Sequence, residues 1–349
     1  MVNNESYVNF ADMKYSFIIP VYNRPDEVDE LLESLCTQTL KDFEVVIVED
    51  GSSIPCKDVV DRYADRLDIQ YFSKPNSGPG QTRNYGVERA SGEYVLILDS
   101  DVVLPNGYLQ AVDDELKAKP CDAFGGPDRA HPSFTPTQKA INYAMTSFFT
   151  TGGIRGGKKK MDKFYPRSFN MGVRTEVYKA LDGFSKMRFG EDIDFSTRIF
   201  KGGYACRLFP EAWVWHKRRT DLHKFFKQVH NSGIARINLT KRHPGTLKLV
   251  HMLPAVFTAG CVLLLILALI TVLVGCPYFW VWLTPFALFA LIIFLDATRA
   301  EKSAGVGLRA VLAAFVQLTG YGSGFLRAVW ERCILGRGEF EAFKKNFYK

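Results

Sequence analysis

The sequence lacks the cysteine spacings that hold a zinc ion or a disulfide framework. Its seven cysteines are scattered without a C-x-x-C pair, and two of them, Cys261 and Cys276, lie in or beside a very apolar segment. This pattern argues against both kinds of site and fits a reducing compartment. The first dozen residues are polar, so we expect no cleavable signal peptide and a cytosolic location for the soluble part.

Two common phosphate-binding motifs are also missing. No G-x-G-x-x-G follows the first apolar run, which disfavours a dinucleotide dehydrogenase. Residues 152–159 (Gly-Gly-Ile-Arg-Gly-Gly-Lys-Lys) come close to a P-loop, but the final Ser or Thr is missing and no strand is expected before them. We interpret this segment as a mobile basic loop that could cover a diphosphate or an anionic lipid, with a solvated linker as the alternative.

The composition is that of a folded, basic protein. The chain has 349 residues, of which 47% are hydrophobic, and this excludes a disordered protein and allows one large or two ordinary domains. Its formal net charge of +7 suits a membrane surface, nucleic acid or phosphate-rich substrates. Because basic residues cluster around the apolar C-terminal segments, a membrane explains the charge better, and we expect no nucleic-acid partner.

Two long uncharged runs predict a membrane hairpin. We expect spans at about 253–274 and 278–295, and the first would be roughly 33 Å long as a helix. Basic residues flank the pair on both sides, so the positive-inside rule places both flanks in the cytoplasm. A third apolar stretch, at about 308–330, carries Gln317 and several glycines. We expect it to form an interfacial or re-entrant helix, with a third span as the alternative.

These segments divide the chain into three parts. We expect an N-terminal tail at 1–14, a globular domain at 15–240, and a membrane region at 241–349 that ends in a basic tail. The protein would then be a multi-pass protein of the cell (inner) membrane with its globular domain in the cytoplasm. Membrane lipids are therefore expected partners.

Four apolar runs in the N-terminal half alternate with helical patterns and predict an α/β fold. The runs lie at 15–21, 44–48, 69–72 and 94–98, and each is followed by polar residues. Successive strand–helix units imply right-handed crossovers and a mostly parallel sheet with flanking helices. Because the carboxyl ends of parallel strands meet at one edge, we expect these polar residues to lie together.

The fourth run, which ends in Asp99-Ser100-Asp101, is the centre of the expected site. Alternation along an extended chain would point Asp99 and Asp101 to the same side, where one could contact a ribose and the other a metal ion that bridges two phosphates. An isolated D-x-D is more often a strand followed by a turn. Asp50 at another strand end could accept from a base N–H, and Arg83 at a helix start could face phosphates. Together these residues predict a nucleotide-diphosphate site.

Two segments further along add an acidic helix start and a histidine. Glu191, Asp192 and Asp194 open a helix, where stabilisation of the helix dipole is the alternative to a functional role. His216 ends a short apolar strand. At the edge of the sheet it could be the third protein ligand of a metal ion held by aspartates.

Over residues 15–238, several motifs occur in the order and rough spacing of family 2 glycosyltransferases with the GT-A fold, which this chain therefore resembles. The motifs are Pro20-Val-Tyr-Asn-Arg24, Glu49-Asp-Gly-Ser52, Asn76-x-Gly78 running to Arg83-Asn84-x-Gly86, Asp99-x-Asp101 and Gly190-Glu-Asp192. The resemblance implies that Asp50 contacts the nucleobase, Asp99 the ribose and Asp101 a Mg²⁺ or Mn²⁺ ion. It also implies that Arg83 lies near the nucleotide and that Asp192 is the general base.

The resemblance extends to further residues and has two departures. The further positions are, for the donor, Pro20, Tyr22, Arg24 and Ser100, for the donor sugar and acceptor, Asn170 and Glu191, and, as a metal ligand in some relatives, His216. Glu49 stands where many members of the family have aspartate. The Q-x-x-R-W signature of processive synthases is not found, because Gln228 is followed by Val-His-Asn-Ser. We therefore expect transfer of a single sugar rather than polymerisation.

The predicted activity is inverting, metal-dependent glycosyl transfer. The donor would be a nucleotide-diphosphate sugar, which we expect to be a UDP-sugar, and the acceptor a lipid-linked or saccharide hydroxyl at the cytoplasmic membrane face. The metal ion and nearby cations would neutralise the leaving diphosphate, and Asp192 would activate the acceptor. Two alternatives stay open, a membrane-tethered nucleotidyltransferase and a non-catalytic membrane-associated binding protein.

Overall fold

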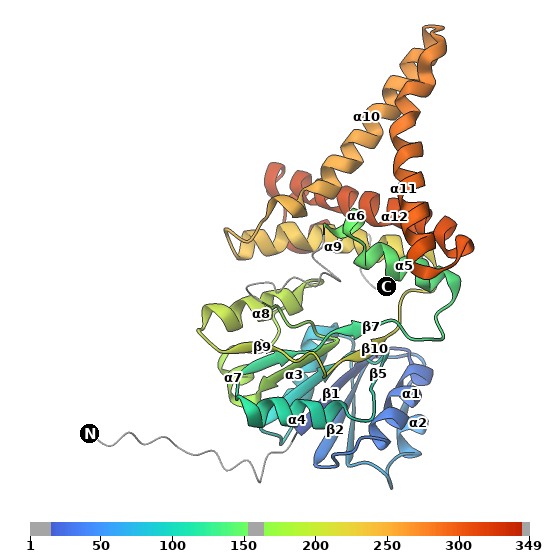
Figure 1. Cartoon of the computed structure of the whole chain (residues 1–349). Helices are drawn as coiled ribbons and strands as arrows, with labels where there is room; N and C mark the ends of the chain where they lie inside the picture. Colours follow the sequence, from blue (N-terminus) through green and yellow to red (C-terminus); the bar gives the residue numbers. More distant parts are fainter. Residues whose placement is uncertain (1–14, 153–163, 344–349) are drawn as a thin grey trace. The chain divides into compact units, whose positions relative to one another are not determined.

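A computed structural model describes residues 15–152 and 164–343, and its contacts divide the chain into two compact units (Figure 1). The first unit is Met1–His131, Met161–Met187 and Glu191–Lys217, and the second is Pro132–Lys160, Arg188–Gly190 and Arg218–Lys349. This division differs from a single boundary at residue 240, because the segments 132–160, 188–190 and 218–240 group with the C-terminal helices. The expected tail at 1–14, most of the basic loop at 152–159 and the last residues of the basic tail lie outside the described residues.

The first unit is built on a seven-stranded sheet in the order β3-β2-β1-β4-β8-β6-β9. Its four parallel strands lie where the sequence predicts them and are β1 (Tyr15–Val21), β2 (Phe43–Asp50), β3 (Ile69–Lys74) and β4 (Tyr94–Leu98). The remaining strands are β6 (Ala123–Gly125), β8 (Asn170–Arg174) and β9 (Cys206–Leu208), of which β8 runs antiparallel to both neighbours. The mostly parallel α/β sheet is thus confirmed. Its chain order reverses at β1, and this switch point is where ligands bind in open α/β sheets.

Helices cover both faces of this sheet, as the alternation of strands and helices predicts. One face packs against α1 (Pro25–Cys36) and α4 (Tyr108–Ala118), and the other against α3 (Pro79–Val87), α7 (Thr175–Ala180) and α8 (Glu191–Lys201). The short α2 (Lys57–Asp61) precedes β3. In α1 the apolar residues recur at helical spacing and are buried: Val28, Leu31, Leu32 and Leu35. The central strands are buried on both faces, which is why they read as continuous apolar runs.

A small second sheet in the first unit carries the histidine strand. Its order is β5-β10-β7, with the strands β5 (Val102–Val103), β7 (Asp128–Arg129) and β10 (Val214–His216). The apolar stretch at 94–105 is therefore not one strand. It leaves the large sheet at Leu98, turns at Ser100 and Asp101, and enters the small sheet at Val102. The expected alternation of Asp99 and Asp101 along an extended strand is wrong for this reason.

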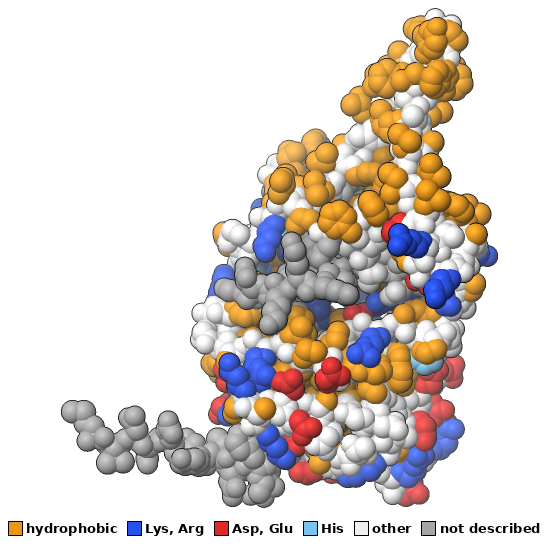
Figure 2. Space-filling model, viewed as in Figure 1, with side chains coloured by type: hydrophobic (Ala, Val, Ile, Leu, Met, Phe, Trp, Pro, Cys, Tyr) orange, Lys and Arg blue, Asp and Glu red, His pale blue; other side chains and the backbone are white. Residues whose placement is uncertain are grey.

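The second unit consists of helices. They are α5 (Pro136–Thr146), α6 (Phe148–Thr151), α9 (Leu222–Arg242), η2 (Leu249–His251), α10 (Leu253–Leu273), η3 (Pro277–Leu283), α11 (Thr284–Glu301), α12 (Ala304–Ala328), η4 (Val329–Ile334) and α13 (Glu339–Ala342). Three helical stretches are long and apolar enough to cross a membrane: Leu253–Leu273, Pro277–Glu301 and Ala304–Ile334. Figure 2 shows hydrophobic side chains gathered over the hairpin that α10 and α11 form.

The third apolar stretch differs from the other two in its surroundings. In its most apolar window 39% of the residues are buried, against 6% in each of the others, because α12 packs closely along α9. A side chain at Gly324 would lie 2.0 Å from the backbone oxygen of His230, and one at Gly233 would lie 2.2 Å from that of Tyr321. Glycine at these two positions allows the helix backbones to touch. α5 also joins this unit, through a 2.5 Å hydrogen bond that the Tyr143 hydroxyl donates to Asp296 on α11.

Candidate functional site

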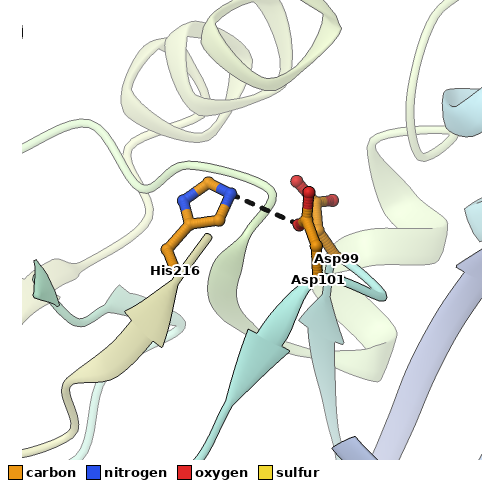
Figure 3. A group of neighbouring side chains, drawn as sticks. All are labelled: Asp99, Asp101 and His216. Atoms are coloured by element: carbon orange, nitrogen blue, oxygen red, sulfur yellow. Dashed lines mark ion pairs between the residues drawn. The ribbon is translucent and has the colours of Figure 1, made fainter. Parts of the chain in front are cut away.

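Three side chains that the sequence singled out converge where β4 leaves the large sheet. Asp99 follows β4, Asp101 lies in the turn before β5, and His216 ends β10 (Figure 3). One ligand atom from each of the three lies within 4.8 Å of the others, and Nε2 of His216 is 3.4 Å from Oδ1 of Asp101. Two carboxylates and an imidazole are suitable ligands for Mn²⁺, and the carboxylates also suit Mg²⁺. The turn at residues 100–101 brings the acids together, so the expected cluster forms for a reason other than strand alternation.

Each of the two aspartates is held by an arginine from a different element. Arg24, in the loop after β1, places its Nη1 2.6 Å from Oδ2 of Asp101. Arg83, on α3, places its Nη2 2.7 Å from Oδ1 of Asp99 and its Nη1 3.0 Å from Oε1 of Glu191. The side chain of Arg83 is only 3% exposed and bridges Asp99 and Glu191. It therefore does not face the solvent, as we would expect of a phosphate-binding side chain. Its proximity to the nucleotide stays a prediction.

The acids that open α8 are also paired with cations. Nε of Arg167 is 2.6 Å from Oδ2 of Asp192, and Oδ1 of Asp192 accepts from its neighbour Ile193 N at 2.8 Å. Both Asp192 and Glu191 are buried. Burial raises the pKa of Glu191, against the attraction of Arg83. Burial also opposes ionisation of Asp192, but the charge and hydrogen bond of Arg167 outweigh it and hold the pKa of this carboxyl below its ordinary value. Asp192 is therefore a carboxylate at neutral pH.

The acids at the end of β2 contact the protein itself. Asp50 accepts from Lys74 Nζ at 2.5 Å, Ser77 N at 2.9 Å and Gly78 N at 3.0 Å. Gly78 has a φ of 87°, a conformation that favours glycine and aims its N–H at the carboxylate. Asp50 thus shapes the loop after β3, and its contact with a nucleobase stays a prediction.

Glu49, the residue that departs from the family pattern, holds the neighbouring loop. Its carboxylate accepts from the Ser52 hydroxyl, from Cys56 N at 2.9 Å and from the Tyr71 hydroxyl at 3.1 Å. Ser52 in turn accepts from Asn23 N at 2.8 Å. The loops after β1 and β2 are therefore connected through one buried carboxylate.

The other predicted residues take varied positions. Pro20 lies within β1, Tyr22 is exposed directly after it, and Ser100 is buried in the turn between the two aspartates. Asn170, at the start of β8, is 1% exposed, and its amide accepts from the Tyr108 hydroxyl at 2.7 Å and donates to Ala212 O at 2.8 Å. These contacts join structural elements, so a role of Asn170 in recognising the sugar is not supported by any free polar atom and stays a prediction.

Two residues without a predicted role lie next to the site. Arg167 lies shortly before β8, and nothing in the sequence around it marks it as the partner of Asp192. Asp128 lies on the two-residue strand β7, and its Oδ2 is 3.9 Å from Nδ1 of His216. A strand of this length gives no periodic signal, so only the tertiary structure reveals Asp128.

Known proteins resemble this chain in sequence over the part that contains the four parallel strands. Residues 16–181 match the family model described as Glycosyl transferase family 2. An uncharacterized glycosyltransferase of Rickettsia bellii is 40% identical over 101 residues, which are 29% of this chain and 15% of that protein. Poly(ribitol-phosphate) beta-N-acetylglucosaminyltransferase TarS of Staphylococcus aureus is 39% identical over 93 residues, 26% of this chain and 16% of TarS. The chain thus covers less than two thirds of the length of these relatives.

A solved structure extends the likeness to most of the chain. The mannosyltransferase PcManGT from Pyrobaculum calidifontis, determined in complex with GDP-Man and Mn²⁺, superposes with a TM-score of 0.57. The match covers 91% of this chain and 88% of PcManGT at 17% identity. At this identity the likeness concerns the fold, and it confirms the expected GT-A architecture.

Proposed function

We propose that the chain, whose residues 16–181 match the model of Glycosyl transferase family 2, transfers one sugar from a nucleotide-diphosphate sugar to a hydroxyl group of an acceptor at a membrane surface. The observation that carries this proposal is the convergence of Asp99, Asp101 and His216 at the switch point of the sheet. Donors of this kind bind at that edge of an α/β sheet.

The donor site would combine these side chains with a divalent cation. Asp101 and His216 would hold Mn²⁺ or Mg²⁺, and Asp99 would contact the ribose. When bound, the cation supplies positive charge that stabilises the leaving diphosphate. The donor set fits such an ion, because its two carboxylates and imidazole meet within 4.8 Å. Arg24, which is 30% exposed and contacts Asp101, is placed to add positive charge on the same side.

Asp192 would be the base on the acceptor side. It accepts the proton of the acceptor hydroxyl while the oxygen bonds to the anomeric carbon and the bond from that carbon to the diphosphate breaks. Attack from the side opposite the leaving group inverts the configuration. The ion pair with Arg167 supports this role, since it keeps Asp192 ionised and holds its carboxylate in one orientation.

The donor and acceptor classes are proposed from chemistry and from the relatives. The name of TarS states a sugar transferase that acts on poly(ribitol-phosphate), and PcManGT was solved with GDP-Man. We propose a UDP-sugar as donor and a single transfer, since Gln228 does not begin a Q-x-x-R-W run. The acceptor would be a lipid-linked or saccharide hydroxyl.

The second unit supports action at a membrane. Basic residues lie on both sides of the hairpin: Lys241, Arg242 and Lys248 before it, and Arg299, Lys302 and Arg309 after it. These basic flanks support the proposal, since by the positive-inside rule both ends of the hairpin would lie in the cytoplasm. The close packing of α12 on the polar helix α9 favours an interfacial position for α12 over a third span.

Calorimetric titration of the detergent-solubilised chain with UDP and GDP, each with and without Mn²⁺, tests the donor site. We expect UDP to bind in a metal-dependent way. No binding of either nucleotide in the presence of metal would overturn the proposal and leave a non-catalytic membrane-associated protein. Binding of a triphosphate with release of pyrophosphate would instead identify a nucleotidyltransferase.

Substitution of the base separates chemistry from binding. Asp192→Asn keeps the size of the side chain but removes its negative charge, so transfer should fall by about 10²–10⁴-fold. The affinity for UDP with Mn²⁺ should stay within about twofold of wild type. Lost donor affinity with normal turnover would contradict the role of Asp192.

A further inference from the structure

His216 has one nitrogen on the metal site and one that faces away from it. Its Nε2 lies toward Asp101, at 3.4 Å from Oδ1. In the described part of the chain, its Nδ1 is buried without a hydrogen-bond partner. A buried polar nitrogen without a partner is costly, and such atoms in native proteins usually have a functional reason.

The side chain opposite Nδ1 is Asp128. Its Oδ2 is 3.9 Å from Nδ1. β7 and β10 are parallel neighbours in which Val214 pairs with Asp128. Because side chains alternate along a strand, His216 lies on the same face of β10 as Val214 and is thus a diagonal neighbour of Asp128. The register of the small sheet therefore brings this carboxylate to the histidine.

A second contact fixes the plane of the imidazole. The ring of Phe169 lies on the ring of His216, with centroids 4.8 Å apart and an angle of 31° between the planes. This packing leaves the two ring nitrogens pointing at two carboxylates, Asp101 and Asp128. A closing movement of about 1 Å, from 3.9 Å to a hydrogen bond of about 2.9 Å, would complete the contact with Asp128.

We propose that Asp128 is a positioning residue of the metal centre, which accepts the Nδ1 proton of His216 and thereby fixes the tautomer whose Nε2 lone pair faces the cation. In the other tautomer the proton sits on Nε2, directed at Asp101, and the nitrogen cannot bind a metal ion. A carboxylate behind a metal-binding histidine also raises the basicity of the ligand. The inference rests on the proposed function, because it assumes a cation between Asp101 and His216.

The same carboxylate links the metal site to the proposed base. The charge of Asp128 contributes, after those of Asp192 and Glu191, to the raised pKa of Arg167, the residue that holds Asp192. Arg167 therefore lies in the field of two carboxylates, Asp192 beside it and Asp128 beside His216. A small effect of Asp128 on turnover is expected through this path, so metal affinity and the state of His216 are the decisive readouts.

The test uses the full-length chain in detergent and two aspartate substitutions in the first unit. In Asp128→Asn the affinity for Mn²⁺, measured by electron paramagnetic resonance with saturating UDP, should fall by about 10–100-fold. The matched control is Asp114→Asn, whose aspartate is exposed on α4 and accepts from Gln110. The control should bind Mn²⁺ as the wild type does. Equal affinity of Asp128→Asn and wild type would overturn the proposal.

Nitrogen-15 NMR of histidine-labelled protein gives a second, metal-free readout. The His216 signals, assigned with His216→Gln, should show a proton on Nδ1 in the wild type and a shift toward Nε2 in Asp128→Asn. A wild type protonated on Nε2 would overturn the role of Asp128. If Asp128→Asn fails to fold, Asp128→Glu keeps the carboxylate and should keep the proton on Nδ1, and loss of it there would also overturn the proposal.

The two failures are distinguishable. If the wild type binds no Mn²⁺ with UDP present, the metal-dependent proposed function is wrong, and the NMR measurement still decides whether Asp128 fixes the tautomer. If the wild type binds Mn²⁺ and neither its affinity nor its tautomer depends on Asp128, the proposed function stands and the inference about Asp128 falls.

Discussion

Two strand ends at the same edge of the large sheet, separated by β1, carry similar acidic sequences and have different environments. β2 ends in Glu49-Asp50 and is followed by Gly51-Ser52, and β4 is followed by Asp99-Ser100-Asp101. The acids of the first end are 1% and 4% exposed and accept hydrogen bonds from the loops around them. The side chains of Asp99 and Asp101 are 31% and 12% exposed and converge with His216.

The difference comes from the path of the chain after each strand. After β2 the chain folds back and brings Cys56 N to Glu49, and the neighbouring strand β3 with its following loop brings Lys74 and Gly78 N to Asp50. After β4 the chain turns into the small sheet, where β10 supplies a histidine. Acidic residues at a strand end thus indicate where they lie in the sheet, but not what they do. Whether they organise loops or hold a ligand depends on the partners that the fold brings to them.

The largest effect that separates the two ends is expected from Asp50→Ala. The substitution leaves Lys74, whose side chain is 11% exposed, without its counterion, which we expect to cost about 3 kcal/mol of folding free energy. For a unit of this size the melting temperature should fall by roughly 6–12 °C. Differential scanning fluorimetry of the purified chain measures this. An unchanged melting temperature would show that the β2 end is not structural and would break the comparison.

Asp101→Ala should have the converse effect. It removes one of the three proposed metal ligands, so the affinity for Mn²⁺ in the presence of UDP should fall by about 100-fold or more, a larger loss than that expected for Asp128→Asn. The melting temperature should change little, because the partner Arg24 is partly exposed and can be hydrated. Isothermal titration with Mn²⁺ measures the affinity. Wild-type affinity together with a large loss of stability would reverse the assignment of the two ends.

Glu49→Gln should cause a smaller loss of stability at the end of β2. Glutamine keeps an acceptor oxygen for Cys56 N and Tyr71 OH, which share one carboxylate oxygen, but brings its amide group opposite the Ser52 hydroxyl, which donates to the other oxygen, so we expect a loss of about 1–3 kcal/mol. Affinity for Mn²⁺ should remain that of the wild type. Urea titration followed by tryptophan fluorescence measures the stability. A variant with a free energy of unfolding equal to or higher than that of the wild type would contradict a structural role for this carboxylate.

Arg167→Met should move a pH profile without removing activity. Arg167 holds the pKa of Asp192 low against burial, so the proposed base is ionised, and we expect transfer to be lost only as the pH falls through this lowered pKa. Without the arginine, burial dominates, the pKa of Asp192 rises, and the acid limb of kcat/KM moves to higher pH. Initial rates between pH 4 and pH 8 measure the limb, with Arg198→Met as control, since Arg198 pairs with Asp194 on the same helix. An acid limb at the wild-type pH would show that Arg167 does not control the pKa of the proposed base.

Local patterns alone predicted much of this protein. The four parallel strands, the buried face of α1 and the two hairpin spans follow from the spacing of apolar residues and from the length of uncharged runs. These features depend on contacts between residues near in sequence or on the surrounding solvent, so the local order of apolar and polar residues is enough to predict them. The positions of the acidic motifs and of the short apolar strand at 212–217 likewise pointed to Asp99, Asp101 and His216 as site residues.

The tertiary structure decided the partners of those residues. The turn that joins Asp99 and Asp101, the burial of Arg83 beneath two acids, and the contacts of Asn170 with Tyr108 and Ala212 depend on segments far apart in the chain. The same holds for Arg167 beside Asp192 and for Asp128 beside His216. A charged side chain takes its role from the charges and hydrogen-bond donors around it, and in this protein those come from elements that only the fold brings together.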